Sequence, residues 1–214
     1  MNTLNIAIPA GQRASSSPAR GYNTSEFWEH LWRTSGIQFV ASFLIAYGIS
    51  GYLPRVGAVL YGLTVLNLMW FAAALRTTLA DAGRDGWGGA VTAASAALGG
   101  LAFVLVAAAG LNDASGLSGF AWTGVVLSSF PRAMLIMAGT FGLWRAGQIS
   151  NALFASGVAA VVLVLLGGTT WMSSGFWAPD GAYSHFVSPI IGLVWVVVVS
   201  RILLTRSPAT RAGW

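Results

Sequence analysis

Six long apolar stretches, separated by short polar segments, dominate the hydrophobic pattern of the chain. Each is close to the ~20 residues that a helix needs to cross ~30 Å of hydrocarbon. They cover residues 36–53, 58–75, 88–110, 120–142, 150–170 and 184–204. The pattern predicts an all-α fold, a polytopic transmembrane bundle of six spans. Only the segment PRVG separates the first two stretches, which predicts a tight helical hairpin.

A shorter amphipathic pattern precedes the first span. In residues 23–33, apolar side chains follow helical spacing after a capping residue: Phe27, Trp28, Leu31 and Trp32. We expect a helix lying at the membrane interface there. Residues 1–22 lack the apolar core of a signal peptide and, with residues 207–214, are predicted to be cytoplasmic tails, the first disordered. The membrane domain is then 23–206.

Composition and charge support membrane insertion and set its direction. The chain is 56% hydrophobic and only 8% charged, whereas about a quarter of the residues of a soluble domain are charged. If the N-terminus is cytoplasmic, Arg55 alone is outside, Arg132 lies within a span, and nine arginines are cytoplasmic: Arg13, Arg20, Arg33, Arg76, Arg84, Arg145, Arg201, Arg206 and Arg211. The positive-inside rule therefore predicts that both termini lie in the cytoplasm.

Missing residue types exclude several chemistries. All basic residues are arginine, so a Schiff-base lysine is impossible, and the absence of cysteine removes thiolate metal sites, iron–sulfur clusters and cysteine nucleophiles. We predict no cofactor and no metal. The net charge of +5 is spread over the ends of apolar stretches and forms no basic patch, so we predict no nucleic-acid partner.

Arg132 is the principal candidate site residue, because it lies in the apolar segment LSSFPRAMLIMAG at residues 127–139. An arginine at mid-membrane costs between ~2.5 and more than ~10 kcal/mol, and no span contains an acidic residue to pair with it. Pro131 leaves the carbonyl of Leu127 without its helical donor. We expect Arg132 to be held by that carbonyl together with Asn67, Ser128 and Ser129. Arg132 is then a packing pin, a receptor for an anion or lipid headgroup, or a side chain that snorkels to one surface.

Aromatic and titratable residues gather on the predicted outer side, before the sixth span: Trp171, Trp177, Asp180, Tyr183 and His185. Tryptophan and tyrosine at this level normally anchor spans at the interface. Asp180 and His185 are also candidates for a proton-handling or metal-binding pair, because a carboxylate orients an imidazole.

One pattern is similar to an enzyme motif. Residues 116–119, GLSG, resemble the GxSG motif of rhomboid intramembrane proteases. The resemblance implies a catalytic dyad of Ser118 and His185, with Asn67 as an oxyanion-hole residue. The chain departs from that family at Leu63, where a histidine is expected. This is a remote alternative, and no enzymatic activity is assigned.

Small residues fill the third span, as GGAVTAASAALGGLAF, and recur at Gly139, Gly142, Ser156 and Gly157. Small side chains let helices approach closely in lipid, where packing drives their association. The pattern therefore predicts close helix contacts at these positions.

Three stretches together resemble an uncharacterised family of bacterial polytopic membrane proteins, known only as a domain of unknown function. They are LNLMWFAAALRTTLADAG, SSFPRAMLIMAGTFGLWRAGQISNALF and GGTTWMSSGFWAPDGAYSHFVSPIIGLVW. The resemblance implies a multi-pass helical bundle in the bacterial cytoplasmic (inner) membrane and supplies no activity.

The leading function at this level is an accessory, interaction or structural membrane subunit, because no acidic residue lies within a span to couple transport to protons. The alternative is a small transporter or an anion- or lipid-binding protein that uses Arg132. The expected partners are the lipid bilayer and either other membrane subunits or further copies of the chain.

Overall fold

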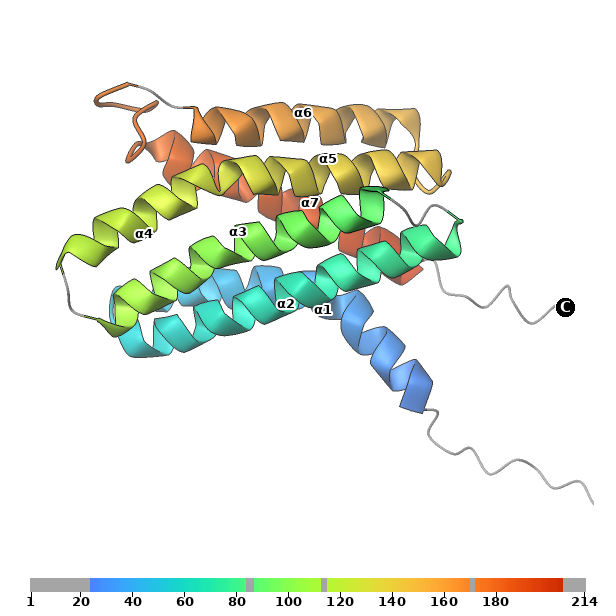
Figure 1. Cartoon of the computed structure of the whole chain (residues 1–214), viewed down its shortest axis with the longest axis horizontal. Coiled ribbons are helices and arrows are strands. Elements are labelled where there is room, and N and C mark those ends of the chain that lie inside the picture. Colours follow the sequence, from blue (N-terminus) through green and yellow to red (C-terminus); the bar gives the residue numbers. More distant parts are fainter. Residues whose placement is uncertain (1–23, 84–86, 113–114, 170–171, 206–214) are drawn as a thin grey trace, which may run out of the picture.

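The computed structural model describes residues 24–83, 87–112, 115–169 and 172–205, and every regular element within them is helical (Figure 1). The elements are α1 (Thr24–Ile49), α2 (Pro54–Asp81), α3 (Trp87–Leu111), α4 (Ser115–Leu127), α5 (Ser129–Arg145), α6 (Asn151–Gly168), the π-helical turn η1 (Tyr183–Val187) and α7 (Ser188–Thr205). The predicted all-α fold is confirmed. The predicted tails lie outside the described residues.

Five helical segments of the described chain are long and apolar enough to cross a membrane: Pro54–Asp81, Gly88–Leu111, Leu117–Arg145, Asn151–Gly168 and Tyr183–Thr205. They identify a multi-pass membrane protein. The sixth expected span, in α1, does not reach this standard. Its apolar part, residues 36–49, covers only about 20 Å at ~1.5 Å per residue, and Arg33 precedes it in the same helix. The count of six spans therefore stays a prediction.

The predicted interfacial helix and the first predicted span form one continuous helix, α1. Residues 34–36, between the two predicted segments, are helical, and the hydroxyls of Thr34 and Ser35 donate back to the carbonyls of Leu31 and Trp32. Back-bonding of this kind bends helices without ending them. In Figure 1 the first turns of α1 project away from the bundle.

The described helices close into a ring. α1 packs against α2 and α7, α2 against α3, α3 against α5, α5 against α6, and α6 against α7, while α4 leads into α5 and packs against α3. The first two long helices are joined by four residues and pack against each other, as expected of a hairpin. The predicted connection is wrong, because residues 50–53 join the helices and PRVG forms the first turn of α2. The ring places the middle of α5 next to the bundle interior.

Glycines sit where the helices approach most closely. A Cβ atom on Gly139 would lie 2.8 Å from the Trp195 ring and 2.9 Å from Leu75, and one on Gly142 would lie 2.8 Å from Leu79. A Cβ atom on Gly157 would overlap the side chain of Thr140. The prediction of close helix contacts is confirmed at these three glycines, which let α5 approach α2, α6 and α7.

Candidate functional site

The helix that carries Arg132 is interrupted just before it. α4 ends at Leu127 and α5 begins at Ser129, and Figure 1 shows α4 tilted away from the axis of α5. The break follows from Pro131, which has no N–H to donate to the Leu127 carbonyl. The hydrogen-bond ladder resumes at once, since Arg132 N donates to Ser128 O at 3.0 Å. The interruption predicted from Pro131 is therefore present.

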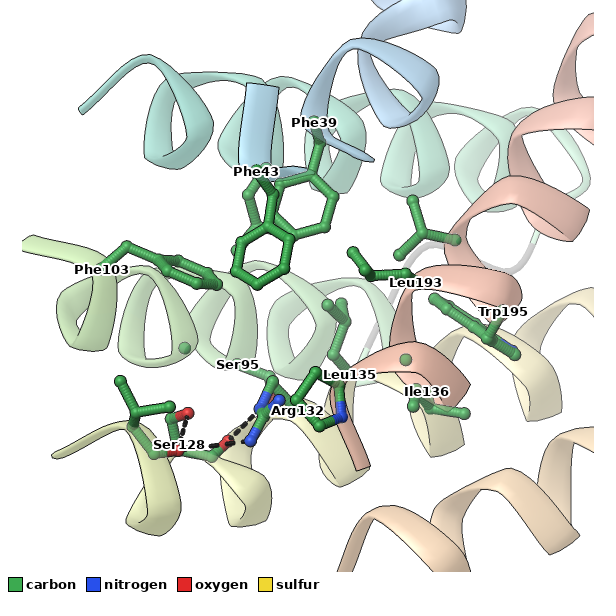
Figure 2. A pocket seen from close by; sticks show the side chains of 16 residues that line it. Phe39, Phe43, Ser95, Phe103, Ser128, Arg132, Leu135, Ile136, Leu193 and Trp195 are labelled. Carbon is green, nitrogen blue, oxygen red and sulfur yellow. Dashed lines mark hydrogen bonds between the residues drawn. The ribbon is translucent and has the colours of Figure 1, made fainter. Parts of the chain in front are cut away.

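Arg132 folds back onto the segment that precedes it (Figure 2). Its Nε donates to the Ser128 carbonyl at 3.3 Å, and its Nη2 donates to the Val125 carbonyl at 3.2 Å and to Ser129 Oγ at 3.0 Å. A guanidinium has five N–H donors, so two, both on Nη1, have no acceptor in the described part of the chain. No described carboxylate pairs with Arg132, so no acidic side chain in the described part of the chain compensates its positive charge.

Of the four expected partners of Arg132, Ser128 and Ser129 hold it, and the Leu127 carbonyl and Asn67 do not. The Val125 carbonyl accepts the bond that was expected at Leu127. Ser129 accepts through its hydroxyl, and Ser128 accepts through its backbone carbonyl. Asn67 instead donates to Ser42 Oγ at 3.4 Å, beside Thr64, which donates to the same hydroxyl at 3.1 Å. The rotation of α2 turns Asn67 toward α1, so this residue belongs to the contact between α1 and α2.

A cavity of about 60 Å³ lies at the centre of the ring, beside Arg132. Its walls come from α1, α2, α3, α4, α5 and α7 and are mostly apolar. Three rings form one aromatic side, with Phe103 6.1 Å from Phe39 and 5.5 Å from Phe43 in edge-to-face geometry (Figure 2). Because a water molecule needs ~10–15 Å³ of such space, the cavity has room for about four waters or a small solute.

Ser95 supplies a second polar group to this cavity. It is buried, lines the cavity, and makes no hydrogen bond with any other described residue. It lies one helical turn before Gly99, where a Cβ atom would be 3.7 Å from Arg132 Cγ, so Ser95 and Gly99 share the face of α3 that adjoins the arginine. Ser95 is not among the predicted site residues. In the sequence, Ser95 is marked only by its position four residues before Gly99. Both lie in the stretch of small residues that was interpreted as a site of close helix packing.

The aromatic residues predicted to gather before the last span are assembled around the loop 172–182. Trp177 stacks on Tyr183 with ring centroids 4.6 Å apart, and the Tyr183 hydroxyl donates to the Leu163 carbonyl at 2.8 Å. Trp171 lies outside the described residues. The Tyr183 hydroxyl fixes the loop to α6, and the anchoring of these aromatics at the membrane interface stays a prediction.

His185 stacks on Trp122 with ring centroids 3.9 Å apart and an interplanar angle of 13°. No hydrogen bond or ion pair joins His185 to Asp180, which is exposed. The described residues contain no group of three histidine or acidic side chains that could hold a metal ion. Trp122 is a further residue not among the predicted ones, and its Nε1 donates to the Pro179 carbonyl at 3.1 Å.

The serine protease geometry is not assembled in the described chain. Ser118 is exposed in the first turns of α4, not in a turn between helices. No hydrogen bond joins it to His185, whose ring lies flat against Trp122. Asn67, the expected oxyanion-hole residue, contacts Ser42 on α1.

Replacing Trp122 by phenylalanine should loosen the loop 172–182. The ring can still stack on His185, but the hydrogen bond to the Pro179 carbonyl is lost, which costs ~0.5–1.5 kcal/mol. Amide hydrogen exchange in residues 172–182 should therefore accelerate about threefold to tenfold by mass spectrometry. Unchanged exchange in that loop would show that Trp122 does not hold it.

Comparison of the chain with protein-family models, with curated proteins and with solved structures finds no match.

Proposed function

We propose that the protein is a multi-pass membrane protein that binds a small monovalent anion in the central cavity, through Arg132 and Ser95, as the binding step of a small transporter. One observation carries the proposal: Arg132 borders a cavity with two N–H donors that no described residue accepts. A guanidinium prefers carboxylate and related planar anions as acceptors.

The bonding of Arg132 disfavours the packing-pin alternative. All three of its side-chain hydrogen bonds go to Val125, Ser128 and Ser129, within its own span. A pin would tie that span to another helix, whereas these bonds only orient the guanidinium. Close contacts of α5 with α2, α6 and α7 are made elsewhere, at Gly139, Gly142 and Thr140.

Charge, depth and size define the ligand class. One uncompensated positive charge calls for one negative charge, since burial of an unpaired ion in an apolar site is costly. Arg132 lies near the middle of the 29-residue segment Leu117–Arg145, the depth at which transporters hold their substrates. A cavity of about 60 Å³ suits an anion of about four heavy atoms, such as acetate, given ~10–15 Å³ for one water.

The membrane, the orientation of the chain in it and the sixth span are part of the proposal. Arginine placement supports an orientation with both termini in the cytoplasm. The three stretches that resemble the uncharacterised bacterial membrane family support membership of that family and a bacterial inner membrane. In this arrangement the first turns of α1 lie at the interface and the rest of α1 forms a sixth, short span. The bent entry of α1 into the bundle supports this placement (Figure 1).

Replacing Arg132 by glutamine should abolish anion binding. In detergent, the thermal unfolding midpoint of the wild-type protein should rise as acetate replaces gluconate, an anion too large for the cavity, at constant ionic strength. A ligand at 100 times its Kd stabilises the folded state by ~2.7 kcal/mol. The Arg132→Gln variant should show no rise, and its midpoint in gluconate should stay close to wild type, because glutamine can still bond to the neighbouring acceptors.

Arg201→Gln is the matched control, since Arg201 is an exposed arginine near the end of α7. It should keep the acetate response. Equal responses in wild type and Arg132→Gln, or no response in wild type together with a lower midpoint for Arg132→Gln in gluconate, would overturn the proposal and support the packing pin.

A second candidate, the accessory or structural subunit, is favoured by the exposure of α6. Only 17% of the 18-residue segment Asn151–Gly168 is buried inside the bundle. Its large side chains Leu153, Val162 and Leu166 are 40%, 53% and 39% exposed. Native mass spectrometry of gently extracted protein separates the two candidates. A co-extracted polypeptide of fixed stoichiometry supports the subunit, and a retained small anion supports the binding protein.

A further inference from the structure

A groove of about 430 Å³ runs along the side of the bundle on α5, with Gly88 of α3 at its edge. Its floor and rim include Met134, Met137, Phe141 and Arg145. We infer that this groove binds an anionic phospholipid, with the acyl chain along the apolar residues and the phosphate on Arg145. The groove shares no residue with the central cavity.

The spacing of the lining residues gives the groove its direction. Positions 134, 137, 141 and 145 follow one another at three- and four-residue intervals, so they form one stripe along α5. Met134, Met137 and Phe141 are 46%, 39% and 40% exposed. From 134 to 145 the stripe is about 16 Å long at ~1.5 Å per residue, about half of the ~30 Å hydrocarbon thickness. That length matches one leaflet, and hence one acyl chain.

Charge lies at one end of this stripe only. Arg145 is exposed in the last turn of α5. Its guanidinium carbon lies 5.7 Å from the centre of the Phe141 ring, a cation–π contact that leaves the N–H donors at the edge of the guanidinium unoccupied. No described acidic residue pairs with it. A phosphate, which binds arginine through paired N–H donors, is the complementary group.

The surroundings favour a lipid over a peptide as the occupant. The stripe lies on a membrane-spanning segment, where the neighbouring phase is lipid. Flexible methionine side chains adapt to an irregular chain, and basic pockets between spans on the cytoplasmic side are typical sites for anionic headgroups. A zwitterionic lipid has the same acyl chain but no net negative charge, so the site should discriminate by headgroup.

Native mass spectrometry of detergent-purified full-length protein with equimolar phosphatidylglycerol and phosphatidylcholine tests the inference. The wild-type protein should bind the first at least fivefold more than the second. Arg145→Gln should reduce that preference to about one, because the phosphate loses its partner. Met137→Trp should lower occupancy by both lipids, because the larger ring fills the groove.

Two control variants isolate the groove. Arg201→Gln removes an exposed arginine from another helix, and Arg132→Gln removes the arginine of the cavity. Both should keep the wild-type lipid preference. The inference is overturned if the wild-type protein binds the two lipids equally, or if Arg145→Gln keeps the preference for phosphatidylglycerol. Circular dichroism of each variant confirms that lipid loss does not reflect unfolding.

Discussion

Replacing Gly157 by leucine should destabilise the bundle by about 2–4 kcal/mol and separate α6 from α5. The Cβ atom of a side chain at 157 would overlap Thr140 Cγ2 and Oγ1 and lie 3.0 Å from Thr140 Cβ. Overpacking of a tight contact costs ~1–3 kcal/mol. Displacing Thr140 also breaks the buried hydrogen bond that Trp195 Nε1 donates to its hydroxyl at 2.9 Å, worth ~1 kcal/mol.

Thermal unfolding in detergent measures this loss. A chain of this size loses ~2–4 °C in the midpoint for each kcal/mol, so Gly157→Leu should lower it by about 4–16 °C. Gly62→Leu is the matched control, because a Cβ atom on Gly62 meets no atom within 4 Å. The control should stay within about 2 °C of wild type, in line with the small effects of surface substitutions. Equal midpoints for the two variants would contradict the close contact of α5 and α6.

The fold was largely predictable because its signals are local. Apolar stretches set the positions of α3, α6 and α7 to within a few residues, since each must be long enough to cross hydrocarbon. The stretch 58–75 falls within α2 but ends six residues before it does, at Asp81. Pro131 set the break between α4 and α5 for an equally local reason. The predicted start of α2, Ala58, lies four residues after its observed start, because Pro54 and Arg55 are typical of a loop. Proline is nonetheless favoured in the first turn of a helix, and α2 begins at Pro54.

The candidate site was predictable only where its contacts are also local. Ser128 and Ser129 lie within four residues of Arg132, so any helix places them beside it. Asn67 depended on the rotation of α2, which hydropathy does not fix when a helix is apolar on every face. Ser95 could not be separated from the surrounding small residues for the same reason, because only packing against α5 shows that its face adjoins the cavity.

Replacing Gly192 by leucine should reduce anion affinity at least tenfold, equivalent to ~1.4 kcal/mol, while Arg132 stays in place. Gly192 lines the cavity, and a Cβ atom there meets no atom within 4 Å. A leucine side chain would therefore extend into the space of about 60 Å³ that the anion requires. The thermal midpoint in gluconate should equal or exceed that of wild type, because apolar atoms fill a cavity instead of leaving it empty.

Acetate titration of Gly192→Leu, with Gly62→Leu as control, distinguishes the contribution of the cavity volume to anion binding from that of the positive charge. Arg132→Gln removes the charge and leaves the cavity open, whereas Gly192→Leu closes the cavity and leaves the charge. Loss of the acetate response in both variants, with the response kept in Gly62→Leu, places the anion inside the cavity against the guanidinium. If Gly192→Leu keeps the full response, Arg132 receives the anion from outside the cavity, and the aromatic wall of Phe39, Phe43 and Phe103 has only a packing role.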